Sequence, residues 1–190
     1  MTLPEFEPSA LLSRVFDDAL LQGPFTVLDV GGVVPETLDY LSAYPCRVTV
    51  VDLLDEPFVP ALPGDDDPYS AHRAYEEALS VLDTPYDVCL FWDYPNYLPM
   101  DTLRAFADVL APFVHNRTRG HAFAGLSTQQ RLPATRYGVT NTTMFSARPM
   151  NRMPPEHVHT QGELADAFGY FKIARGTLKE GRVEVELERV

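Results

Sequence analysis

Acidic residues and glycines follow two short apolar runs in the first third of the chain. Asp29 lies at the end of the first run and precedes the adjacent glycines Gly31 and Gly32. Asp52 ends the second run, 20 residues after Gly32. Glycine lets a backbone approach a ligand closely, and an acid in this place can accept both hydrogens of a ribose diol. We therefore expect these four residues to hold a ligand; the alternative for either acid is a local role as a cap of backbone N–H groups.

A third group of polar residues follows the next apolar run, where Asp93, Asn96 and Tyr97 stand. Ligands of parallel α/β sheets bind at the carboxyl ends of the strands, so these side chains are expected to reach the same site. We predict that Asp93 contacts a cofactor and that Asn96 and Tyr97 contact a substrate or partner. The alternative is turn formation, because Asp, Pro and Asn are common in tight turns.

The charge of the chain is unevenly distributed. The net charge is −12, which argues against general nucleic-acid binding. Residues 1–112 hold 20 of the 27 acidic residues and only 4 of the 15 basic residues. Residues 127–155, in contrast, contain no acid and four arginines, Arg131, Arg136, Arg148 and Arg152. We predict that these arginines form a docking surface for an anion or an acidic protein partner; the alternative is a solvated loop.

The histidines and cysteines favour neither a metal site nor a disulfide framework. His157 and His159 lie two apart, but no Asp, Glu or Cys at ligand spacing accompanies them. Two cysteines, Cys46 and Cys89, are too few for a zinc cage and indicate a reducing, cytoplasmic interior. The N-terminus lacks a signal-peptide pattern, and no stretch approaches the ~20 apolar residues of a membrane helix. We expect no metal and no membrane span.

Strands and helices alternate along the chain, which predicts an α/β fold with a largely parallel sheet and helices on both faces. The expected buried strands are 25–30, 47–53, 88–92 and 120–125. The expected helices are 9–20, 35–43, 71–82, 99–114 and 160–168. A C-terminal antiparallel hairpin is expected from 171–178 and 182–187. Residues 55–68 indicate a loop and residues 127–159 a long irregular loop, within one domain spanning 1–190.

These segments resemble class I S-adenosylmethionine-dependent methyltransferases. The resemblance covers residues 9–190 and rests on three segments, 27–32, 48–52 and 86–93. They resemble the family's first strand and glycine loop, its second strand with an acid at its end, and its fourth strand. The resemblance implies a three-layer, Rossmann-like fold, with Asp29 near the methionine end of the cofactor and Asp52 on its ribose. Residues 92–98 also resemble a segment of uncharacterised bacterial methyltransferase-like proteins.

Two departures from the family pattern bear on function. Val33 and Pro35 stand where the family has its second and third glycines, and β-branched side chains tolerate positive φ poorly. The chain between Asp52 and Asp87 is short for the usual helix, strand and helix, so the family's third strand is expected to be short or missing. Both departures favour a site that holds S-adenosylmethionine poorly or not at all.

Two classes of function remain, because a fold alone does not decide between them. We favour a non-catalytic binding or assembly module, with a degenerate cofactor site and a protein partner. The alternative is an active methyltransferase acting on a small molecule or protein, since methyl transfer rests mainly on proximity and needs few catalytic residues. Residues 93–97 only partly match the Asp/Asn-Pro-Pro-aromatic motif of amino-group methyltransferases. The absent Gly-x-Gly-x-x-Gly pattern argues against a nicotinamide dehydrogenase.

Overall fold

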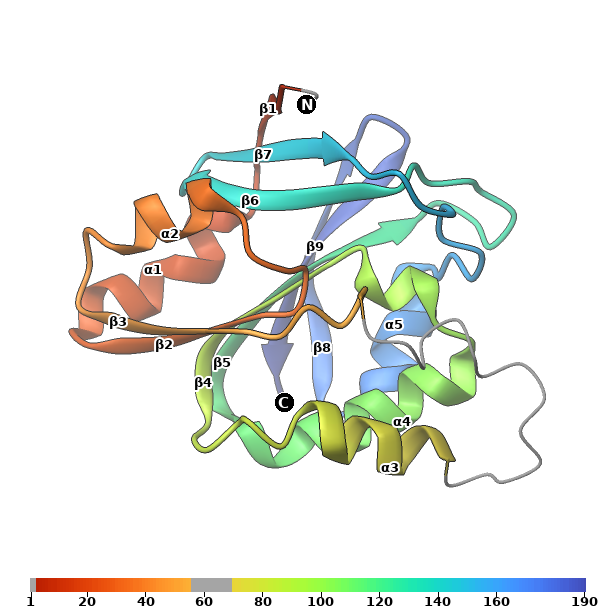
Figure 1. The fold of residues 1–190 in the computed structure, drawn as a ribbon, viewed down its shortest axis with the longest axis horizontal. Helices are drawn as coiled ribbons and strands as arrows, with labels where there is room; N and C mark the ends of the chain where they lie inside the picture. Colours follow the sequence, from red (N-terminus) through yellow and green to blue (C-terminus); the bar gives the residue numbers. More distant parts are fainter. Residues whose placement is uncertain (1–2, 56–69) are drawn as a thin grey trace.

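A computed structural model describes residues 3–55 and 70–190 of the chain, which contain two sheets (Figure 1). The strands of the larger sheet are β2 (Phe25–Asp29), β3 (Cys46–Val50), β4 (Tyr86–Trp92), β5 (Val114–Gly125), β8 (Phe171–Lys179) and β9 (Arg182–Arg189). The strands of the smaller sheet are β1 (Glu5–Pro8), β6 (Thr135–Asn141) and β7 (Met144–Pro149). Most of the loop expected at 55–68 lies outside the described residues.

The larger sheet has the strand order β3-β2-β4-β5-β9-β8. Its first four strands run parallel, and β9 pairs antiparallel with both β5 and β8. This arrangement confirms the predicted α/β class, the mostly parallel sheet and the C-terminal antiparallel hairpin. Between β3 and residue 70, none of the residues that the structure describes forms a further strand.

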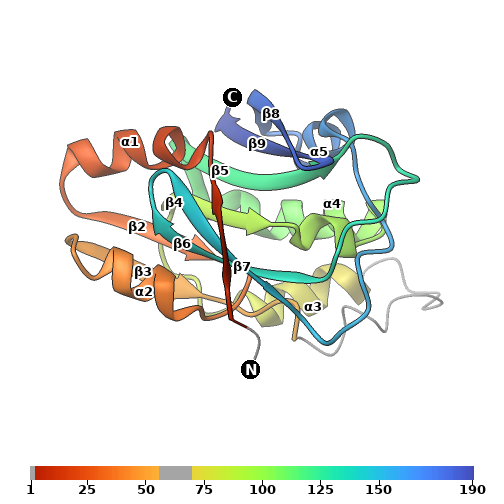
Figure 2. The same cartoon turned by 90° about the horizontal axis from the view of Figure 1, so that it is seen from above.

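Helices cover both faces of the larger sheet (Figure 1, Figure 2). One face carries α1 (Leu12–Gln22) and α2 (Pro35–Leu41), and the other carries α3 (Ser70–Ala78), α4 (Met100–Leu110) and α5 (Gln161–Phe168). Two short 3-10 helices, η1 (Tyr94–Tyr97) and η2 (Ala111–Phe113), flank α4. Because neighbouring strand residues point to opposite faces, β2 and β4 are apolar on both sides and supply two separate cores. No helix in the described part of the chain is long and apolar enough to cross a membrane.

The expectation of an irregular loop over 127–159 is wrong, because this segment contains the hairpin of β6 and β7. Alternate residues of the two strands are apolar and buried against the core beneath α1, namely Tyr137, Val139, Phe145 and Ala147. The turn is closed by Asn141, whose side-chain oxygen accepts the backbone N–H of Thr143 at 2.8 Å. β1 then adds to the free side of β7, and the resulting small sheet crosses over the larger one (Figure 2).

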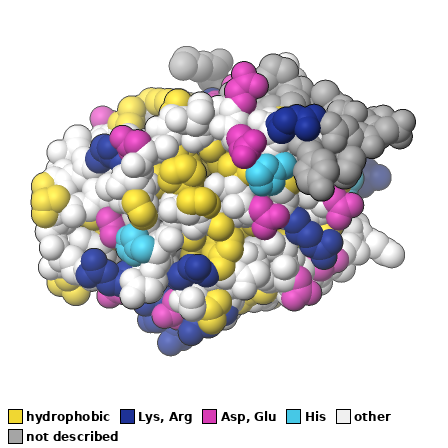
Figure 3. All heavy atoms as spheres, turned by 90° about the horizontal axis from the view of Figure 1, so that it is seen from below, with side chains coloured by type: hydrophobic (Ala, Val, Ile, Leu, Met, Phe, Trp, Pro, Cys, Tyr) yellow, Lys and Arg dark blue, Asp and Glu magenta, His cyan; other side chains and the backbone are white. Residues whose placement is uncertain are grey.

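The opposite side of the molecule carries an apolar groove between α3 and α4. Figure 3 shows hydrophobic side chains gathered near the centre of this face, among acidic ones. The groove has a volume of about 420 Å³, and its apolar lining comprises Leu79, Leu82, Val109, Pro112 and Phe113. It lies on the far side of the sheet from the hairpin of β6 and β7.

Candidate functional site

Three predicted acids lie at the carboxyl ends of three neighbouring strands. Asp29 ends β2, Asp52 follows β3, and Asp93 follows β4. These strands are adjacent in the larger sheet, so the structure brings the acids to one edge, as the sequence predicts. This edge, together with the glycine loop that follows β2, is the candidate site.

Asp29 organises the loop from within the protein. Its Oδ1 accepts the backbone N–H of Gly31 at 2.9 Å and the indole N–H of Trp92 at 3.0 Å. The side chain is buried, and burial raises its pKa to about 7 although both hydrogen bonds lower it. The carboxyl group therefore titrates near neutrality and acts as an acceptor for the chain's own donors.

The two glycines of the loop are covered by side chains of the same chain. A Cβ atom added at Gly31 would lie 2.6 Å from Cδ1 of Trp92. One added at Gly32, whose φ is +88°, would lie 2.3 Å from Oδ2 of Asp52. Glycine is required at both positions, since any larger residue would collide with the indole or the carboxylate. The atoms that approach these two backbone positions closely are those of Trp92 and Asp52.

Asp52 is bound by one of the predicted docking arginines. Nη2 of Arg136, on β6, lies 2.9 Å from Oδ2 of Asp52 and 3.3 Å from Oδ2 of Asp55. Burial raises the pKa of Asp52, and the charge of Arg136 opposes that rise. The predicted ribose-binding acid and a predicted partner-binding arginine therefore contact each other, 84 positions apart in the sequence.

Two further arginines join the same edge, while the fourth lies elsewhere. Arg148, on β7, forms an ion pair with Glu36 of α2. Arg152 lies 3.4 Å from Oδ1 of Asp55 and also donates to the carbonyl of Leu54. Arg131 lines a different pocket, in which Glu5, Glu7 and Glu180 are also found. The surface predicted from four arginines thus divides into a group of three and a separate residue.

A pocket with a volume of about 500 Å³ opens between the glycine loop and the hairpin. Its lining consists of Val33, Asp55, Arg136, Arg148, Pro149, Met150, Asn151 and Arg152. We call it the arginine pocket. The hairpin packs tightly on the glycine loop, because a Cβ atom added at Gly138 would lie only 2.5 Å from Cγ1 of Val34.

The polar residues after β4 have different surroundings. Asn96 is fully buried, donates to the carbonyl of Phe123 at 2.8 Å and accepts the backbone N–H of His159 at 2.8 Å. Its amide therefore anchors η1 and is engaged within the fold. Burial raises the pKa of Asp93 to about 8, although the charges of arginines nearby lower it. The guanidinium of Arg152 lies 5.7 Å from the ring centre of Tyr97, beside the arginine pocket.

Trp92 contacts the candidate site, although the sequence analysis did not place it there. It has a positive φ of 52°, rare for a bulky side chain, and this conformation ends β4. Its ring stacks on Tyr137 of β6 at 5.5 Å and an interplanar angle of 21°. It is the only tryptophan in the sequence, but the apolar run that contains it indicates a buried strand. The stack depends on a hairpin that the sequence pattern did not reveal.

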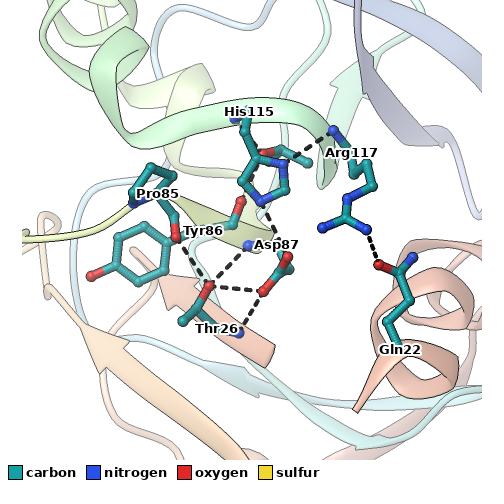
Figure 4. A network of polar contacts seen from close by, with 8 residues as sticks. Gln22, Thr26, Pro85, Tyr86, Asp87, His115 and Arg117 are labelled. Carbon is teal, nitrogen blue, oxygen red and sulfur yellow. Dashed lines mark hydrogen bonds and ion pairs between the residues drawn. The ribbon is translucent and has the colours of Figure 1, made fainter. Parts of the chain in front are cut away.

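His115 has a structural role, in a cluster of polar contacts. His115 lies 3.1 Å from Asp87, which also accepts the backbone N–H and the hydroxyl of Thr26 (Figure 4). Its Nδ1 accepts the backbone N–H of Arg117, which leaves Nε2 to carry the proton toward Asp87. This cluster joins β2, β4 and β5 at the amino ends of the strands, away from the candidate site. Within the ranges 3–55 and 70–190, no three His, Cys, Asp or Glu side chains are grouped to hold a metal.

The fold is similar to that of solved methyltransferase structures. The chain is similar to magnesium protoporphyrin IX methyltransferase from Synechocystis PCC 6803, solved with bound S-adenosylhomocysteine. That match has 15% identity and a TM-score of 0.53, and covers 95% of this chain and 80% of that one. It is also similar to the 1,6-didemethyltoxoflavin-N1-methyltransferase of Burkholderia thailandensis, with 18% identity, a TM-score of 0.51, and coverage of 94% and 76%. A methyltransferase of Aquifex aeolicus described as SAM-dependent matches with 16% identity, a TM-score of 0.51, and coverage of 95% and 90%.

No family model and no curated protein sequence matches the chain. The structural matches show a divergent class I methyltransferase-like fold, as the sequence resemblance implies. Because all identities are below a fifth, they establish the fold and leave the activity to be argued from the site.

Proposed function

We propose that this chain is a non-catalytic, cytoplasmic binding module that keeps the methyltransferase fold around a degenerate cofactor site. The observation that carries the proposal is the filling of the glycine loop by Trp92 over Gly31 and by Asp52 over Gly32. In this proposal the two side chains make the contacts with the loop that a cofactor would otherwise make. Retaining the fold without the cofactor leaves its surface free to bind a protein partner or another ligand.

The residues of the site do not fit S-adenosylmethionine. A ribose would need both oxygens of Asp52, but Oδ2 is bound to Arg136 at 2.9 Å. The methionine end of the cofactor would lie beside Asp29, whose Oδ1 already accepts two N–H groups. The hairpin of β6 and β7 packs on the glycine loop at Val34. This contact supports the proposal that Trp92 and Asp52 cover the loop permanently.

One observation favours the alternative, an active methyltransferase. Oδ2 of Asp29, Oδ1 of Asp52 and Oδ2 of Asp93 are buried and have no hydrogen-bond partner within the described ranges. Buried polar atoms are ordinarily paired with protein, ligand or ordered water, so these three oxygens mark places that a ligand could serve. They lie at the carboxyl ends of β2, β3 and β4, where such a ligand would bind.

Calorimetric titration of the whole chain with S-adenosylmethionine and S-adenosylhomocysteine distinguishes the two functions. The non-catalytic proposal expects no saturable heat from either compound, with a cooperative thermal unfolding curve as the control that the sample is folded. Micromolar binding would contradict it. In that case Asp52→Ala should weaken binding by roughly 1–3 kcal/mol if Asp52 holds the ribose. Binding unchanged by the substitution would reject that role for Asp52.

A further inference from the structure

We propose that the arginine pocket binds a small organic anion, a carboxylate attached to an apolar body. This inference rests on the proposed function, because it names the ligand class of a module that does not use the cofactor. Four features of the pocket carry it: its charge, the support of its arginines, the carboxylate already at its mouth, and its apolar wall.

The lining of the pocket is richer in basic than in acidic side chains, although Asp52 and Glu36 pair with two of its arginines from outside the lining. Among the described residues that line it are three arginines and one acid, whereas the whole chain has a net charge of −12. The side chains of Arg136, Arg148 and Arg152 are 27–30% exposed, so each is held by the fold and still reaches the pocket. A guanidinium carries five N–H donors in a planar fork and suits a carboxylate or phosphate.

Each arginine is supported from behind by a different partner. Asp52 holds Arg136, Glu36 holds Arg148, and the carbonyl of Leu54 holds Arg152. These contacts fix the directions of the three side chains before any ligand arrives. These contacts use only a minority of the N–H groups of the three guanidinium groups. Groups held in this way lose little conformational freedom when they bind, which is a property of built sites.

Asp55 occupies the place expected for the ligand's carboxylate. Its two oxygens bridge Arg136 and Arg152 at 3.3 and 3.4 Å, longer than a charged hydrogen bond of good geometry. Its side chain is also 66% exposed, so solvent weakens both ion pairs. Asp55 is therefore a replaceable occupant, and an external carboxylate can make shorter bonds to the same two arginines.

The rest of the lining defines the body of the ligand. Val33 is 57% exposed at the edge of the glycine loop, and Pro149 and Met150 form the wall at the end of β7. An exposed valine beside proline and methionine offers apolar surface next to three guanidinium groups. A volume of about 500 Å³ is that of a small-molecule site. The geometry thus favours a small acid with an apolar portion over inorganic phosphate alone.

Titration with phenylacetate, its neutral amide phenylacetamide, and inorganic phosphate tests this proposal. The protein is the whole chain in low salt, followed by NMR or calorimetry. We expect saturable binding of phenylacetate, weaker binding of phosphate and none of the amide. Asp55→Asn should tighten phenylacetate binding by roughly threefold to fivefold, since it removes the competing carboxylate. Arg152→Gln and Arg148→Gln should each weaken it by about tenfold or more, because a charged hydrogen bond is lost.

Arg131→Gln is the matched control, because it removes an equal charge from the same segment but lines a different pocket. It should leave phenylacetate binding unchanged. The proposal is overturned if neither the wild type nor Asp55→Asn binds phenylacetate, or if phenylacetamide binds equally well. It is also overturned if Arg131→Gln weakens binding as much as Arg152→Gln, since a diffuse charge effect would then explain it.

The same samples separate this inference from the proposed function. Titration with S-adenosylhomocysteine on each variant reports on the glycine loop, and phenylacetate reports on the arginine pocket. If neither phenylacetate nor S-adenosylhomocysteine binds, only the anion site is rejected and the non-catalytic proposal stands. Cofactor binding that is not displaced by phenylacetate rejects the non-catalytic proposal and leaves the anion site standing.

Discussion

At the scale of single residues, Arg136 and Asp52 form the contact that most affects the candidate site. Both side chains are about three-quarters buried, so their attraction is screened less than that of a surface pair. Removing Arg136 leaves a mostly buried carboxylate without its nearest compensating charge. The pair therefore stabilises the hairpin's position over the sheet and also keeps the acid occupied.

We expect Arg136→Gln to lower the free energy of unfolding by about 1–2 kcal/mol, measured by denaturant titration. Arg47→Gln is the control, because the pair of Arg47 with Asp83 is close but exposed on both sides. That change should have no measurable effect on stability. An equal effect of the two substitutions would mean that burial of the Arg136 pair contributes nothing.

Asp29 gives a prediction for the dependence of stability on pH. Its pKa in the folded protein is about 7, whereas a free aspartate titrates near 3.8. Between these values the folded state binds more protons than the unfolded state, so stability falls as pH rises from about 4 to 7. Asp93, with a pKa of about 8, extends the same trend to higher pH.

Asp29→Asn should make the melting temperature less sensitive to pH over this interval. The asparagine keeps the oxygen that accepts from Gly31 and Trp92 and removes the ionisation. Thermal unfolding of both proteins at pH 5 and pH 7.5 measures the effect. A wild-type melting temperature that rises over this interval, or an unchanged slope in the variant, would contradict the assignment to Asp29.

At the scale of secondary-structure elements, the contact between β6 and the glycine loop decides whether the site is filled. Gly138 lies against Val34, and Thr37 of α2 accepts the backbone N–H of Val139 at 2.9 Å. The hairpin is therefore fixed to the loop and to α2 by packing as well as by ion pairs. Its position does not depend on charge alone.

Gly138→Ala should destabilise the protein by about 1–3 kcal/mol, because the new methyl group meets Val34 at 2.5 Å. Gly162→Ala is the matched control, since nothing lies within 4 Å of its added Cβ in α5. That change should stabilise the helix by up to about 1 kcal/mol. Chemical denaturation of both variants decides the matter, and a neutral Gly138→Ala would show that the hairpin moves freely from the loop.

The main elements were predictable from sequence because their signals are local. The apolar runs that became β2, β3 and β4, and the turn before β9, depend on neighbouring residues only. The hairpin of β6 and β7 was not predicted because each strand contributes only two apolar residues to its buried face. Residues such as Tyr137 and Phe145 can be recognised as buried only when the core that they cover is known. The predicted strand ends gave the positions of the acids correctly, but the sequence did not reveal the residues that pair with them.

At the scale of the whole molecule, the uneven charge of the sequence has a structural explanation. The arginines of the hairpin face acids from the first part of the chain, including Glu36, Asp52 and Asp55. The separation of charge along the sequence predicts an external partner for the arginines. The acids that pair with them are 81 to 112 positions away, so no local pattern could reveal them. Part of the predicted docking surface is satisfied internally.

The small sheet also sets an order of events during synthesis. Within the described ranges, β1 pairs with β7 alone, through contacts such as Phe6 with Ser146. Ser9 bonds to Glu184, 175 positions later. On a ribosome, the first strand therefore emerges long before its partners and waits without them. Contacts between distant parts of a chain form slowly and leave unpaired strands exposed meanwhile. Nascent chains that stop before β7 should thus have an unprotected β1, open to proteases and chaperones until β7 has been synthesised.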